Sequence, residues 1–128
     1  MITRPEADTD GLDFAQSAPL WVRMREQQQV PNTVEVMALR IGSVGIVGLP
    51  GEGFCELGLA IKQASPAEHT NVIELAKDAV GYLPSREAYD PGGYEVTPGA
   101  TVYAPGCSER LVASASRQLP ALFKHAGE

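Results

Sequence analysis

The sequence predicts an α/β or α+β fold in which about three helices cover a small mixed sheet of three to four strands. Two apolar segments on either side of Gly42-Ser43 predict a β-hairpin, and a strand, a tight turn and a helix follow from residue 44 to residue 61. An amphipathic segment near the C-terminus predicts a further helix. At 128 residues, one core is expected.

The N-terminal part is expected to hold two kinds of segment. Residues 1–11 are polar and predict a disordered lead-in, so that 12–128 form a single domain. Residues 12–29 have the apolar periodicity of a helix. Its apolar side would consist of Leu20, Trp21 and Met24.

The hairpin is the clearest local signal. Residues 33–41 and 44–49 are rich in branched aliphatic side chains and are separated only by Gly42-Ser43. A two-residue loop with glycine first is typical of a type II′ turn between antiparallel strands. Residues 70–76 predict another buried strand, and the helix that precedes it allows it to lie parallel to 44–49.

The second half of the chain alternates irregular and helical patterns. Residues 78–106 contain four prolines and four tyrosines, which indicates a long loop whose aromatic rings pack on the domain. The apolar residues of 111–123 then predict the final amphipathic helix, with Ser108 as its N-cap and a kink at Pro120.

Composition and charge exclude several classes of function. The net charge is −6 and no cluster of Lys or Arg could follow a phosphate backbone, so nucleic acid is not an expected partner. No apolar run approaches the ~20 residues of a membrane-spanning helix, and the N-terminus lacks a signal-peptide core, so a cytoplasmic protein is expected. Cys55 and Cys107 form no Cys-x-x-Cys pair, which argues against a disulfide framework or a thiolate zinc site.

Glu52 is the first candidate for chemistry. It follows an apolar strand and Pro50-Gly51, where a helix is expected to begin, and the positive end of that helix would favour its ionised form. Such a carboxylate can bind a metal or accept a proton, or it can simply stabilise the first helical turn. With Cys55 and Glu56 it would share one helix face, an arrangement that binds metal when another element completes it.

A longer pattern resembles a known family. Pro50-Gly51-Glu52 after a strand, the run Gly81-Tyr82-Leu83-Pro84-Ser85-Arg86-Glu87-Ala88-Tyr89 and then Gly93-Tyr94-Glu95 resemble the C-terminal part of the catalytic domain of neutral/alkaline (non-lysosomal) ceramidases. The resemblance covers about residues 36–123. It implies a relation to zinc-dependent hydrolysis of amide bonds in N-acyl lipids, in a family whose full-length members are often exported.

The resemblance also implies roles for three residues. Glu52 corresponds to the family's glutamate ligand of zinc, Tyr82 to its tyrosine ligand, and Tyr94 to a tyrosine near the reacting amide, where a phenol stabilises a developing oxyanion. The family's two histidine ligands and its serine have no visible counterpart here, and His69 is a weak substitute. Lys77 stands where relatives have asparagine and Gly53 where a bulkier residue is common; a cation at Lys77 would oppose metal binding.

Three functional hypotheses therefore remain open. The chain is a truncated ceramidase-like protein that is not catalytically complete alone, or a binding or assembly module that uses its tyrosine-rich loop for a lipid-like or small-molecule ligand. Alternatively, a second polypeptide completes the site. Since a sheet this small leaves apolar surface uncovered, a homo-oligomer is expected, most simply a dimer.

Overall fold

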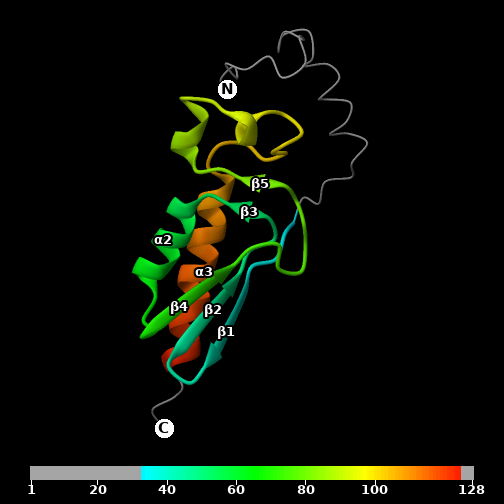
Figure 1. Cartoon of the computed structure of the whole chain (residues 1–128). Coiled ribbons are helices and arrows are strands. Elements are labelled where there is room, and N and C mark those ends of the chain that lie inside the picture. The colour runs from blue at the N-terminus through cyan, green and yellow to red at the C-terminus, as the bar shows by residue number, and fades with distance from the viewer. Residues whose placement is uncertain (1–32, 125–128) are drawn as a thin grey trace, which may run out of the picture.

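The computed structural model describes residues 33–124, in which a three-stranded mixed sheet packs against two α-helices (Figure 1). β1 (Met37–Ile41) pairs antiparallel with β2 (Val44–Gly48), and β2 pairs parallel with β4 (His69–Ile73), in the order β1-β2-β4. The predicted fold class and the hairpin are confirmed. The lead-in and the helix expected within residues 1–29 lie outside the part of the chain that the structure describes.

The hairpin turn is of the predicted type, and the third strand of the sheet, β4, ends earlier than predicted. Gly42 has a φ of 60° while Ser43 does not have a positive φ, which fits the predicted type II′ turn rather than type I′. β4 ends at Ile73 instead of residue 76, because Leu75 and Lys77 adopt positive φ values of 52° and 73°. The amide of Leu75 donates to the carbonyl of Gly51 at 3.3 Å, so the chain leaves the sheet there.

The helices α2 (Cys55–Ala64) and α3 (Cys107–Lys124) cover one face of the sheet. Gly45 brings α3 close to β2, since a Cβ at this position would lie 3.1 Å from Cδ2 of Leu119. The predicted N-cap of α3 is wrong, because Ser108 is buried inside the first turn of the helix. Pro120 lies within α3, which continues to Lys124. The buried core consists of Val36, Val47, Leu49, Leu57, Ile61, Leu83, Ala115 and Leu119.

The segment between β4 and α3, together with residues 52–53 that precede α2, forms a second, smaller layer above the sheet in Figure 1. Its regular elements are β3 (Glu52–Gly53) and β5 (Tyr82–Leu83), which pair parallel, and the 3-10 turns η1 (Arg86–Tyr89) and η2 (Tyr94–Val96). Tyr89 is buried and its hydroxyl donates to the carbonyl of Tyr103 at 2.9 Å. The expectation that tyrosines pack this loop onto the domain is confirmed for Tyr103, which packs against the hydrophobic core. No helix within residues 33–124 is long and apolar enough to cross a membrane.

Candidate functional site

The short β3–β5 pair brings two of the predicted site residues together. Glu52 and Tyr82 are direct partners in the parallel pairing, and the amide of Glu52 donates to the carbonyl of Gly81 at 3.0 Å. Residues that are paired in this way project to the same side of a sheet. Glu52 also follows the carboxyl end of β2, where a parallel strand pair presents ligand sites in open α/β sheets. Both side chains are half-buried.

Two glycines hold this register. A Cβ on Gly51 would collide with the carbonyl oxygen of Gly81, and a Cβ on Gly81 would lie 2.7 Å from the carbonyl oxygen of Ala100. Gly81 also has a φ of 85°, a left-handed conformation that side chains disfavour. The amide of Tyr82 donates to Ala100 at 2.9 Å, so three backbone segments pack directly against one another.

Tyr94 completes the group of three predicted residues. Its ring meets that of Tyr82 edge to face, with centroids 6.0 Å apart and an interplanar angle of 82°, a favoured geometry for aromatic pairs. The turn η2 that carries it is closed by Thr97, whose hydroxyl donates to the carbonyl of Tyr94 at 2.6 Å. Tyr94 is 62% exposed, so its phenol is open to a ligand.

The charges around Tyr82 are negative. The carboxylate of Glu52 raises the pKa of Tyr82 above its ordinary value of 10.0, and desolvation, Glu95 and Tyr94 raise it further. The phenol of Tyr82 therefore stays protonated at neutral pH in the absence of a cation. Glu95 was not singled out from the sequence as a site residue, although it directly follows Tyr94; only the folded chain brings its charge to Tyr82.

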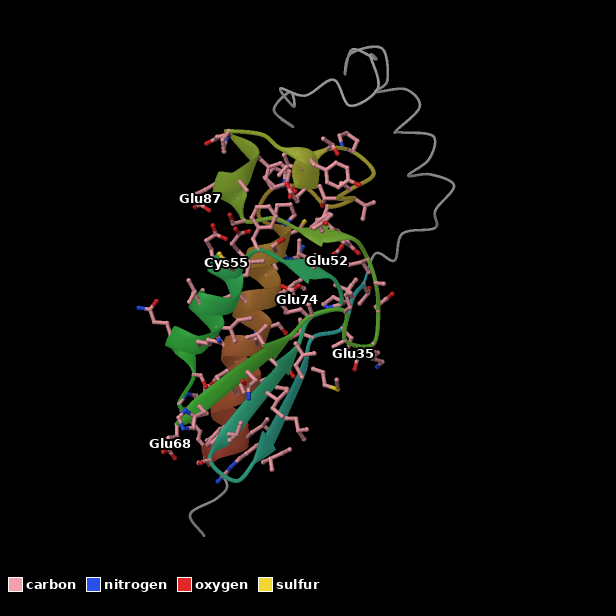
Figure 2. The ribbon with its side chains drawn as sticks, in the orientation of Figure 1. Glu35, Glu52, Cys55, Glu68, Glu74 and Glu87 are labelled. Atoms are coloured by element: carbon pink, nitrogen blue, oxygen red, sulfur yellow. The ribbon has the colours of Figure 1, made fainter. Side chains whose placement is uncertain are left out.

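The expected position of Glu52 at a helix start is wrong. Glu52 lies in β3, whereas α2 begins at Cys55 after the N-cap residue Phe54, and the acidic residue of its first turn is Glu56. Figure 2 shows Glu52 on the β3 segment and Cys55 at the start of α2. Glu52, Cys55 and Glu56 therefore do not share a helix face. Within residues 33–124, no three His, Cys, Asp or Glu side chains converge as a metal-binding group. Cys55 is an exposed free cysteine.

His69 lies at the start of β4, and Lys77 is paired with a carboxylate other than Glu52. His69 begins β4 and pairs with Val44, at the opposite end of the parallel strands from Glu52, and its ring is 3.9 Å from Glu68. The ammonium of Lys77 forms an ion pair with Glu35. The histidine is thus not a candidate for completing this site within one chain, and the lysine has a partner other than Glu52.

The site consists of Glu52, Tyr82 and Tyr94, with Glu95 added by the structure and with Gly51 and Gly81 setting its geometry. A glycine directly before each of Glu52 and Tyr82 was the available sequence signal for that geometry. Searches of protein-family models, of curated proteins and of solved structures found no match to the chain.

Proposed function

We propose that Glu52, Tyr82 and Tyr94 form one side of a ceramidase-type zinc site for hydrolysis of the amide bond of N-acyl lipids, and that the chain is not catalytically complete alone. The observation that carries this proposal is the β3–β5 register, which places the two proposed ligands next to each other. The resemblance to ceramidases implies these two roles from the sequence pattern alone.

The donor set fits part of a zinc site. Zinc in proteins takes about four ligands, and carboxylate oxygens are among those it accepts. Glu52 supplies a carboxylate, Tyr82 a phenol oxygen, and Glu95 adds negative charge beside them, which favours a cation. Nitrogen donors would have to come from outside residues 33–124 or from another chain.

Each residue has a distinct task in the proposed site. Bound zinc would act as a Lewis acid that polarises the amide carbonyl. Glu52 and Tyr82 would hold the ion, and a cation beside Tyr82 would reverse the effect of the neighbouring carboxylates on its phenol. The exposed phenol of Tyr94 would donate a hydrogen bond to the developing oxyanion.

Calorimetric titration with zinc tests the ligands. We expect binding by the full chain to be abolished or strongly weakened in Glu52→Gln and Tyr82→Phe, while Glu56→Gln, a nearby exposed glutamate in α2, binds as the parent does. Equal binding by all four proteins, or none by the parent, would contradict the ligand assignment. Hydrolysis of an N-acylsphingosine by the zinc-loaded chain alone would contradict the claim that the site is incomplete.

A binding module is the second candidate function. The exposed ring of Tyr94, edge-on to Tyr82, favours it because aromatic faces at a surface contribute to ligand binding without catalysis. Saturable binding of a lipid-like or small-molecule ligand that is lost in Tyr94→Ala but is unaffected by zinc or by Glu52→Gln would favour this function over the zinc site.

A further inference from the structure

The rings of Tyr82 and Tyr94 form an open corner at the surface, and we refer to them as the ring pair. Tyr82 lies in β5 and Tyr94 in η2, and their planes are nearly perpendicular, at 82°, with centroids 6.0 Å apart. Because the edge of one ring meets the face of the other, the pair presents two ring surfaces at right angles to a ligand. Tyr94 is 62% exposed and Tyr82 is half-buried, so solvent reaches this corner.

Backbone contacts hold both tyrosines in place. Tyr82 is held by the β3–β5 pairing and by its amide, which donates to the carbonyl of Ala100 at 2.9 Å. The amide and the hydroxyl of Thr97 both donate to the carbonyl of Tyr94, at 3.0 and 2.6 Å. A site whose parts are already in place loses less conformational entropy when a ligand binds.

The charge beside the ring pair is negative. The carboxylate of Glu52 raises the pKa of Tyr82 most, and that of Glu95 raises it further, so both carboxylates act on this phenol. The face of an aromatic ring also attracts a cation, because the quadrupole of the ring makes its face negative. Two ring surfaces and two carboxylates together favour a positively charged ligand.

Another aromatic ring of the protein already has a cation. The guanidinium of Arg40 lies 4.5 Å from the ring centroid of Phe123, within the range of a cation–π contact. Among the residues that the structure describes, no lysine or arginine lies over Tyr82 or Tyr94 in this way. The faces of the ring pair are therefore available to a cation from outside residues 33–124.

We propose that the ring pair binds a trimethylammonium group, such as that of choline, with its methyl groups against the two rings and its charge near the carboxylates of Glu52 and Glu95. Such a group has no N–H to donate, and proteins recognise it with aromatic rings. A rounded cation contacts two perpendicular rings at once, whereas a planar guanidinium lies over one, as Arg40 lies over Phe123. This binding goes beyond the functions proposed above and does not require zinc.

NMR titration of the full chain with choline, in the presence of EDTA, tests the proposal. We expect saturable shifts of the ring signals of Tyr82 and Tyr94, and nuclear Overhauser contacts between these rings and the methyl protons. The neutral analogue in which carbon replaces the nitrogen of choline lacks the charge, and ethanolamine lacks the methyl groups. Both should bind at least about fivefold more weakly than choline. Equal binding of either one, or no saturable shift with choline up to about 50 mM, overturns the proposal.

Paired substitutions separate the ring of Tyr82 from its phenol oxygen. Tyr82→Leu removes the ring and should weaken choline binding about two- to fivefold, whereas Tyr82→Phe keeps the ring and should weaken it less. Zinc binding is expected to be lost in Tyr82→Phe, so failure of the zinc site and failure of this proposal are distinguishable. An equal loss of choline binding in both variants would overturn the proposal.

Phe123→Leu is the matched control for Tyr82→Leu. The ring of Phe123 is already paired with Arg40, so its removal should leave choline binding unchanged. Equal losses in the two variants would mean that choline does not bind at the ring pair. Circular dichroism confirms that each variant is folded.

Glu95→Gln tests the charge, because Glu95 is not a proposed ligand of zinc. Choline binding should weaken about twofold or more in this variant, and the difference from the parent should shrink as salt is raised. Unchanged binding at low salt would contradict the placement of the cation beside this carboxylate.

Cosedimentation with vesicles identifies the source of the trimethylammonium group. Binding to phosphatidylcholine vesicles that is lost in Tyr82→Leu assigns the group to a lipid headgroup, and binding of free choline without vesicle binding assigns it to a small molecule. Phosphatidylglycerol vesicles, which lack the group, are the control. Equal binding to both kinds of vesicle would contradict recognition of the headgroup.

Discussion

The sheet with its two helices and the smaller β3–β5 layer are held together in different ways. In the former, two helices bury aliphatic side chains against a hydrogen-bonded sheet. In the latter, strands of only two residues are placed by backbone contacts at Gly51 and Gly81, and the side chains of interest remain partly exposed. The stability of the domain and the geometry of the candidate site therefore depend on different residues, and can be altered separately.

The largest effect is expected in the helix-covered sheet. Leu119→Ala removes a fully buried side chain from α3 and should lower the free energy of unfolding by about 2–5 kcal/mol, measured by urea denaturation. Leu122→Ala, in the same helix but 37% exposed, is the control and should cost clearly less. Equal losses in the two variants would show that Leu119 is not at the centre of the core.

The next largest effect is expected where the site geometry is set. Gly81→Ala forces a side chain onto a left-handed backbone and against Ala100, which should cost about 1–3 kcal/mol. It should also disturb the Glu52–Tyr82 register, so the pKa of Tyr82 should return toward 10.0.

The control for this change is Gly58→Ala in α2, where a Cβ meets no atom within 4 Å. This substitution should stabilise the protein by about 0.5–1 kcal/mol, since alanine favours the helix. If Gly81→Ala behaves like Gly58→Ala in both denaturation and tyrosine titration, the register does not depend on the close backbone approach.

A purely electrostatic effect is expected from Glu52→Gln. Removing the carboxylate should lower the pKa of Tyr82, which ultraviolet titration of the tyrosines measures, with Glu56→Gln as the control. In the parent protein the pKa of Tyr82 is raised, so the unfolded chain loses the phenolic proton at a lower pH than the folded chain does. The stability that the protonated phenol contributes is therefore complete below pH 10.0 and decreases as the pH rises beyond it. Glu52→Gln should make that decrease of stability with pH shallower. An unchanged tyrosine titration would show that the carboxylate of Glu52 does not act on the phenol of Tyr82.

The smallest effect is expected for Lys77→Gln. Both Lys77 and Glu35 are mostly exposed, so loss of their ion pair should change the free energy of unfolding by less than about 1 kcal/mol. Zinc affinity should also stay nearly constant, because the ammonium is paired with Glu35. A clear gain in zinc affinity would instead support the view that Lys77 opposes metal binding.

Several predictions from the sequence were accurate because they rest on local patterns. The hairpin follows from Gly42-Ser43 between two branched segments, and α2 follows from the spacing of Leu57 and Ile61, both buried. The errors were at boundaries. The sequence predicts Ser108 as a cap because serine often caps helices, but it is buried within the first turn of α3.

For the candidate site, the sequence by itself determined which residue types are available: a carboxylate at Glu52 and phenols at Tyr82 and Tyr94. Only the tertiary structure decided that these three meet, that Glu95 joins them, and that His69 lies at the other end of the strands. The physical reason is that their proximity depends on the packing of the backbone at Gly51, Gly81 and Ala100, which are distant in sequence, and no local periodicity encodes such a contact.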